Sequence, residues 1–151
     1  MEKKDLKPAG VFKYFEEICQ VPRPSKKEEK MIAYLKAFGA KHNLETKVDE
    51  AGNVLIKKPA TPGKENLQTV VLQSHIDMVC EKNNDVQHDF LTDPIETEID
   101  GEWLKAKGTT LGADNGIGVA TELAILADDS IEHGPLECLF TVDEETGLSL
   151  I

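Results

Sequence analysis

The sequence contains 151 residues, with 28 acidic and 17 basic side chains, a formal net charge of -11 and 40% hydrophobic residues. This length fits one domain of ordinary size, and the hydrophobic fraction is sufficient for a buried core. The negative charge argues against nucleic acid as a partner, because phosphate binding requires a basic patch. Acidity suits a site for divalent cations, but it also simply favours solubility, so it assigns no function by itself.

Neither a signal peptide nor a membrane span is predicted. The first seven residues are mostly charged, no apolar h-region follows them, and no apolar run reaches membrane-spanning length. Cys19, Cys80 and Cys138 form no Cys-x-x-Cys pair, which argues against a disulfide framework and a Cys-type zinc site. We expect a cytoplasmic protein with buried apolar cysteines. For Cys80 a functional role stays open, because this residue lies near the candidate site in the sequence.

Two helices are predicted before residue 42. Apolar residues at helical spacing indicate a helix from about Pro8 to Cys19, and Pro22 and Pro24 end it. Ser25, followed three residues later by Glu28, is the pattern of a capping box, so the second helix is expected to begin there. Its buried stripe contains Met31, Ile32, Leu35 and Phe38.

Strands follow in the next sixty residues. Segments 44–48 and 54–57 alternate around a turn at 49–53, which predicts a β-hairpin. Residues 69–74 form a short, β-rich apolar run typical of a strand in the middle of a covered sheet. Asp100-Gly101 indicates a second small hairpin.

The last predicted elements are a helix and a strand. The helix begins at Asn115 or Gly116 and continues to about Ala127, and residues 136–141 indicate another central strand. Helices alternate with strands along the chain, so the predicted class is α/β, with a mixed sheet covered by helices.

The first candidate for chemistry is His75-Ile76-Asp77, directly after a predicted strand. Residues two apart in extended backbone point to the same side. The His75 imidazole is a potential zinc ligand, and the Asp77 carboxylate could orient such a ligand from behind. The pattern is short, and a match to it alone is more often structural than functional.

The second candidate is Asp114, which lies in the glycine-rich segment 112–118. Glycines permit a constrained loop that could present the Asp114 carboxylate. Asp114 could equally be the N-cap of the following helix. The segment could also cradle a phosphate, although no Lys-Ser/Thr pair follows as in a P-loop.

The third candidate is the run Asp143, Glu144 and Glu145, which follows the last predicted strand. Adjacent carboxylates repel one another unless a cation or a proton lies between them. One glutamate could bind an ion while its neighbour acts on the bound water, but a solvated acidic turn is the simpler alternative. Together the three candidates suit a dinuclear zinc or manganese centre. In such a centre, ions about 3.5–4 Å apart activate water and polarise a carbonyl.

The sequence around these candidates resembles the dizinc metallopeptidase family that includes the carnosinases and the aminoacyl-histidine dipeptidases. The likeness spans nearly the whole chain. Its motifs lie at residues 52–56, 70–79, 82–85, 100–103 and 108–118.

The resemblance implies a role for each candidate. His75 would bind one zinc ion, Asp77 would fix His75, and Asp114 would bridge the two ions. Glu144 would be the general base, and Glu145 would bind the second zinc ion. Manganese or cobalt could replace zinc. The implied reaction is hydrolysis of dipeptides, with histidine favoured on the C-terminal side.

Members of the family are several times longer than this chain. The resemblance therefore implies that residues 1–151 form the N-terminal part of the catalytic domain. We expect these residues to lack the family's further acidic ligand, its distant histidine ligand and its inserted lid and dimerisation domain, because His42, His88 and His133 do not match that histidine. We expect the chain alone to be weakly active or inactive, and the complete enzyme to be compatible with a homodimer. The alternatives are a related metallo-amidohydrolase or tripeptidase, a non-catalytic metal-binding fragment, and a nucleotide-binding module.

Overall fold

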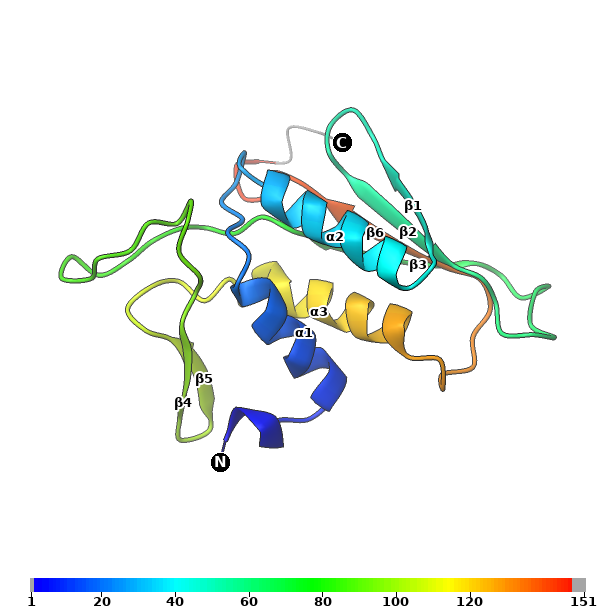
Figure 1. Ribbon diagram of the computed structural model, residues 1–151, viewed down its shortest axis with the longest axis horizontal. Helices are drawn as coiled ribbons and strands as arrows, with labels where there is room; N and C mark the ends of the chain where they lie inside the picture. The colour runs from blue at the N-terminus through cyan, green and yellow to red at the C-terminus, as the bar shows by residue number, and fades with distance from the viewer. Residues whose placement is uncertain (1, 148–151) are drawn as a thin grey trace.

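The computed structural model describes residues 2–147 and has an α/β architecture (Figure 1). A four-stranded sheet, a separate two-stranded hairpin and three α-helices make up the fold. In chain order the elements are η1 (Lys3–Asp5), α1 (Ala9–Cys19), α2 (Glu29–Lys41), β1 (Glu45–Val48), β2 (Val54–Lys58), β3 (Val70–His75), β4 (Thr97–Asp100), β5 (Trp103–Ala106), α3 (Ala113–Ala127) and β6 (Leu136–Thr141). Both predicted hairpins are confirmed, and so is the first predicted helix, which is α1.

The main sheet is mixed, as predicted, with the strand order β1-β2-β6-β3. β2 pairs antiparallel with β1 and with β6, whereas β3 and β6 are parallel. The parallel register runs from Val70 opposite Leu136 to His75 opposite Thr141. The C-terminal ends of β3 and β6 therefore lie side by side, and ligand sites in α/β folds form beyond the carboxyl ends of the strands.

Helices cover one face of this sheet. Residues of β2 and β6 alternate between buried and partly buried, so that Val54, Ile56, Cys138 and Phe140 share the buried face. α2 packs against β1 and β2, α3 packs against β3, and α1 packs against α3 (Figure 1). One apolar core results, and its burial is the main favourable contribution to folding. Its largest fully buried helical side chains are Phe15, Ile18, Met31, Leu35, Leu123 and Leu126.

The position of β3 differs from the prediction. β6 lies inside the sheet as expected, but β3 is the last strand in the order of the described residues. Val70 and Val71 at its start are 50% and 56% exposed. An apolar run predicts a strand, but it does not specify on how many sides that strand is paired.

The start of α2 also differs from the prediction. The helix begins at Glu29, its N-cap residue is Glu28, and no side-chain hydrogen bond caps it. Lys26 has a left-handed φ of 66°, so the backbone is not helical at Ser25 and Lys26. The predicted capping box at Ser25 is therefore wrong. The Ser25 hydroxyl instead donates a hydrogen bond to Asp77.

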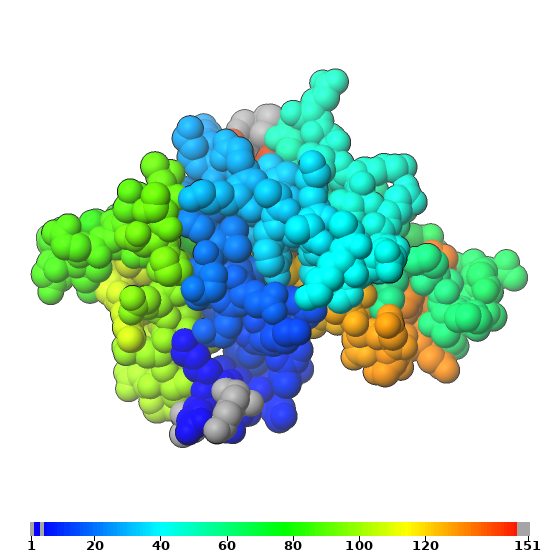
Figure 2. All heavy atoms as spheres, viewed as in Figure 1, coloured from blue at the N-terminus to red at the C-terminus, as the bar shows by residue number. Residues whose placement is uncertain are grey.

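The remaining features agree with the sequence. The segments that follow β2 and β3 project at opposite ends of the molecule (Figure 2).

Cys19 and Cys138 are buried free thiols, and Cys80 is partly buried. Burial raises the pKa of Cys19 and of Cys138 to about 12. None of the helices in the described part of the chain is long and apolar enough to cross a membrane.

One buried acid gives the fold a measurable pH dependence. Glu122 in α3 is 4% exposed. Burial raises the pKa of Glu122 from 4.5 to about 7, although the neighbouring Ser74 hydroxyl and Cys138 thiol lower it. The folded protein therefore holds this proton to a higher pH than the unfolded chain does. The contribution of Glu122 to stability is complete below about pH 4.5 and is lost as the pH rises to about 7.

Replacing Glu122 with Gln should remove this pH dependence. Between pH 4.5 and pH 8 the free energy of unfolding of the variant, relative to that of the unchanged protein, should rise by about 3 kcal/mol, from about 1.4 kcal/mol per pKa unit. Urea denaturation at several pH values measures this difference. Glu132→Gln, at a side chain that is 74% exposed, should leave the pH dependence unchanged. A Glu122→Gln difference that is constant over this pH range would contradict the expectation.

Candidate metal centre

Five predicted site residues meet where β3, β6 and α3 come together. His75 is the last residue of β3, and Asp77 follows it after one residue. Glu144 and Glu145 come shortly after β6, whose end lies beside the end of β3. Asp114 is in the first turn of α3, which packs against β3. The parallel pairing of β3 with β6 thus brings together residues that are distant in the sequence.

His75 lies between two carboxylates. The residue is 5% exposed, Nδ1 is 3.2 Å from Asp77 Oδ1, and Nε2 is 3.0 Å from Asp114 Oδ1. When Nδ1 donates its proton to Asp77, the lone pair of Nε2 is directed towards Asp114. A carboxylate behind the ring in this way fixes the tautomer that binds a metal ion.

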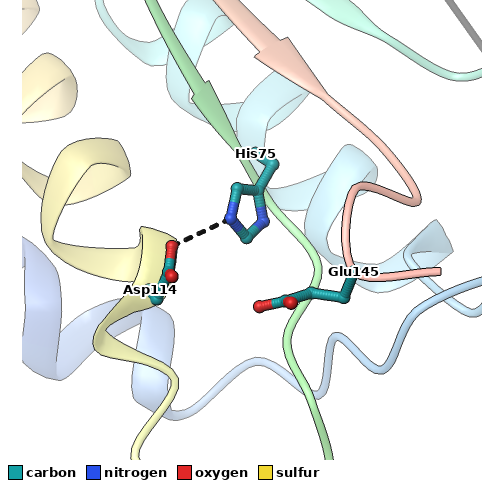
Figure 3. A group of neighbouring side chains, drawn as sticks. All are labelled: His75, Asp114 and Glu145. Atoms are coloured by element: carbon teal, nitrogen blue, oxygen red, sulfur yellow. Dashed lines mark hydrogen bonds and ion pairs between the residues drawn. The ribbon is translucent and has the colours of Figure 1, made fainter. Parts of the chain in front are cut away.

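His75, Asp114 and Glu145 form a group, the metal group, that could hold a metal ion (Figure 3). One ligand atom from each side chain lies within 4.8 Å of the other two. The 3.0 Å between His75 Nε2 and Asp114 Oδ1 suits two ligands of one ion, since each would lie about 2.0–2.2 Å from it. Glu144 Oε2 is 3.8 Å from Nε2 and lies beside this group. The Asp114 side chain is 86% exposed, so the site is open to solvent.

Asp77 organises the site from within the core. It is 0% exposed, and its carboxylate accepts hydrogen bonds from Ser25 Oγ at 2.7 Å and from the backbone N–H groups of Glu144 at 3.1 Å and Glu145 at 3.2 Å. Burial raises the pKa of Asp77, but the bonds from Ser25 and the two amides, with the nearby His75, outweigh it and lower the pKa. Asp77 is therefore a carboxylate that fixes both the imidazole and the loop with the two glutamates.

Three buried carboxylates lie behind the metal group. Carboxylate oxygens of Glu28, Asp77 and Asp143 lie within 4.8 Å of one another. Glu28 Oε1 accepts a hydrogen bond of 2.9 Å from the backbone N–H of Asp143. Burial raises the pKa of Glu28, and the charge of Asp77 adds to the increase, whereas backbone hydrogen bonds oppose it. The bond to Asp143 connects the start of α2 to the loop after β6.

Burial and the neighbouring carboxylates together raise the pKa of Glu145. Burial is the largest cause of the raised pKa of Glu145, and the carboxylates of Asp114, Glu144 and Asp77 add to it, whereas His75 lowers it. A cation among these side chains would relieve this repulsion. The donor set of one imidazole and several carboxylates is also the chemistry that zinc and manganese bind.

The loop before α3 presents Asp114 without using it as a cap. Gly112 has a left-handed φ of 70°, Asp114 and Asn115 are not helical, and the regular helix begins at Gly116. The assigned N-cap residue of α3 is Gly112, and no side-chain hydrogen bond caps it. The N-cap position of α3 is thus assigned to Gly112 and not to Asp114, whose carboxylate contacts His75.

Three residues of the site could not be recognised in the sequence. Arg23, Ser25 and Glu28 all contact the segments after β3 and β6, yet they lie about fifty or more positions earlier in the chain. The proline-rich stretch around them indicates only a helix end. The other histidines lie away from the site, where His42 packs against Phe38, His88 packs against Phe90, and His133 is bonded to the carbonyl of Gly134.

Comparisons with known proteins identify chains of similar sequence and similar fold. The cytosol non-specific dipeptidase of Escherichia coli K12 is 52% identical over 147 residues, which is 97% of this chain and 30% of that protein. The solved structure of aminoacylhistidine dipeptidase from Vibrio alginolyticus is 54% identical, with a TM-score of 0.95 over 99% of this chain and 30% of that one. Aminopeptidase PepT from Bacillus cereus is 25% identical, with a TM-score of 0.76 over 94% of this chain and 39% of that one.

The chain spans about 30% of the length of the two dipeptidases that it matches. The sequence model of Peptidase family M20/M25/M40 matches residues 71–150, which is 80 of the 151 residues. The matched segment contains every residue of the metal group, and also Asp77 and Glu144 beside it. The chain therefore belongs to peptidase family M20/M25/M40.

Proposed function

We propose that this chain is the N-terminal part of the catalytic domain of a zinc-dependent dipeptidase. The observation that carries the proposal is the group His75, Asp114 and Glu145, whose ligand atoms lie within 4.8 Å of one another. Two similar proteins are named dipeptidases and are 52% and 54% identical to this chain. An inserted lid and dimerisation domain and the remainder of the catalytic domain would complete the enzyme.

The three ligands would hold two zinc ions between them. His75 would bind one ion, Glu145 would bind the other, and Asp114 would lie between the two ions. When bound, the ions lower the pKa of coordinated water towards neutrality and polarise the scissile carbonyl group. Manganese or cobalt would suit the same oxygen and imidazole donors.

Glu144 and Asp77 would carry the proton chemistry and the orientation. Glu144 would accept a proton from the attacking water and pass it to the leaving amine as the peptide bond breaks. The backbone N–H of Glu144 donates a hydrogen bond to Asp77, and this bond holds Glu144 beside the metal group. Asp77 would hold His75 in the tautomer whose Nε2 is free to bind metal.

The proposed substrates are dipeptides, with histidine favoured on the C-terminal side. The names of the two most identical relatives described above support dipeptides, and one of them specifies aminoacylhistidine. An aminopeptidase activity is less well supported, because aminopeptidase PepT is only 25% identical. A cytosolic location and a homodimer of the complete enzyme form part of the proposal.

The proposal has a direct test in the full-length protein. Removal of metal with a chelator should lower β-alanyl-histidine hydrolysis by at least about 100-fold, because the polarising and water-activating groups are lost. Added Zn²⁺ should restore the activity, which is measured by release of free histidine. A polypeptide limited to residues 1–151 should have little or no activity. Hydrolysis that persists without metal would contradict the proposal, and EDTA-resistant nucleotide binding would favour the glycine-loop alternative.

A further inference from the structure

The only arginine in the sequence lies beside the metal group. Arg23 is 2% exposed, although it precedes the metal-group residues by more than fifty positions. Within residues 2–147 no carboxylate forms an ion pair with it, and its hydrogen bonds go to backbone carbonyl groups. A buried cation is costly unless its donors are satisfied, so this arrangement requires an explanation beyond packing.

The guanidinium connects the two segments that carry the metal group. Nη1 donates hydrogen bonds to the carbonyl oxygens of Ile76 at 3.1 Å and Asp77 at 3.4 Å. Nη2 donates to the carbonyl oxygen of Gly112 at 2.7 Å. The first two carbonyls directly follow His75, and the third precedes Asp114 by two residues. One planar group therefore fixes the distance between the end of β3 and the loop before α3.

The backbone of Arg23 is itself attached to the same strand exit. The backbone N–H of Met78 donates to the Arg23 carbonyl at 3.1 Å, and Pro24 forms a parallel bridge with Met78. The side chain thus starts from a fixed point and reaches across to Gly112. The Gly112 carbonyl also accepts the N–H of Gly116 at 3.1 Å, so the guanidinium is bonded to the first turn of α3.

Two glycines, one just before α3 and one in its first turn, make room for this contact. A Cβ atom at Gly112 or at Gly116 would lie 2.7 Å from Arg23 Nη2, which is closer than real Cβ atoms approach other atoms. These two glycines therefore serve the close approach of a guanidinium group. The same close approach leaves the glycine-rich segment without the open cradle that a phosphate would need.

We propose that Arg23 is a positioning residue that sets the separation of His75 and Asp114 for metal binding. The inference rests on the proposed function, because it concerns the same metal group. Arginine suits this role better than lysine, because its nitrogens point in fixed, separate directions from a planar group, whereas an ammonium is a single point charge. Ligand atoms 3.0 Å apart tolerate little displacement if they are to share an ion.

The test is Mn²⁺ binding to the full-length protein, followed by the electron paramagnetic resonance signal of free Mn²⁺. Arg23→Lys should raise the apparent Kd on the order of 10–100-fold, as loss of an outer partner of a metal site does. Lys58→Met is the matched control. Lys58 is also a buried cation that donates to backbone carbonyls, those of Ile125 and Asp128 at the far end of α3. Its loss should lower stability but leave the Kd unchanged.

A second pair of variants covers the case in which Arg23→Lys does not fold. Gly116→Ala keeps every charge but displaces the guanidinium, and it should also weaken Mn²⁺ binding. Gly10→Ala is its control, since a Cβ there would meet only Ala124 at 3.5 Å. Unchanged Mn²⁺ affinity in Arg23→Lys or Gly116→Ala would overturn this inference but not the proposed function. Equal losses in a variant and its control would do the same. If the unchanged protein binds Mn²⁺ no more tightly than His75→Ala, the proposed function fails as well.

Discussion

Glu144→Gln is expected to lower kcat for dipeptide hydrolysis by about 100- to 10,000-fold in the full-length protein, the usual contribution of a general base. The amide keeps the size of the side chain but cannot accept a proton from water. Its backbone N–H would still donate to Asp77, so the loop should keep its position. Metal content should therefore remain nearly unchanged, because Glu144 lies beside the metal group and not within it. Steady-state kinetics together with metal analysis of the same sample measure both quantities.

Two controls separate the proposed roles of the neighbouring glutamates. Glu145→Gln should lose metal as well as activity, because Glu145 is a member of the metal group. Glu50→Gln, in the exposed turn between β1 and β2, should change neither. A Glu144→Gln variant that keeps full turnover would show that the base is another residue. A variant that loses metal in proportion to activity would show that Glu144 is a ligand.

Asp114→Ala is expected to lower metal affinity by more than about 100-fold, which exceeds the 10–100-fold loss typical of outer partners. Asp114 is the ligand expected to lie between both ions, so neither ion should be held normally without it. Stability of the metal-free protein should be nearly unchanged, because the side chain is 86% exposed. Calorimetric titration with Zn²⁺ and metal analysis after dialysis provide the measurement.

The matched control is Asp129→Ala, an aspartate whose side chain is 98% exposed just beyond the other end of α3. It removes the same charge without affecting the site, so Zn²⁺ affinity should be retained. His75→Ala should resemble Asp114→Ala. If Asp114→Ala binds Zn²⁺ as tightly as Asp129→Ala does, the proposed bridging role of Asp114 is wrong.

Local patterns in the sequence predicted most elements and singled out His75, Asp114 and Glu145 as candidates, which the structure brings together. Their roles as metal ligands came from the family resemblance and stay a prediction. Alternation predicted that His75 and Asp77 share one side, and their contact at 3.2 Å agrees with this. Glycines around Asp114 predicted the irregular start of α3. These features depend on neighbours within a few residues, which is the range over which hydrophobic spacing and turn chemistry act.

Features that depend on distant contacts were not predictable in the same way. Ser25 matched a capping box, but its hydroxyl bonds to Asp77, which is 52 positions away. Arg23 stood in a proline-rich helix end with no local sign of its bonds to Ile76 and Gly112. The edge position of β3 depends on which strands pair with it, and an apolar run carries no such information. Tertiary contacts decided all three cases.

The parallel pairing of β3 with β6 has a consequence for the order of folding. The β1–β2 hairpin joins neighbouring segments and needs only a short loop to close. β3 must instead wait for β6, since Val70 pairs with Leu136 across the whole intervening chain. Contacts of such high sequence separation slow folding, because the entropy of closing a long loop is lost first. During synthesis, His75 therefore emerges well before Glu145, and the metal group can assemble only after β6 has docked against β3.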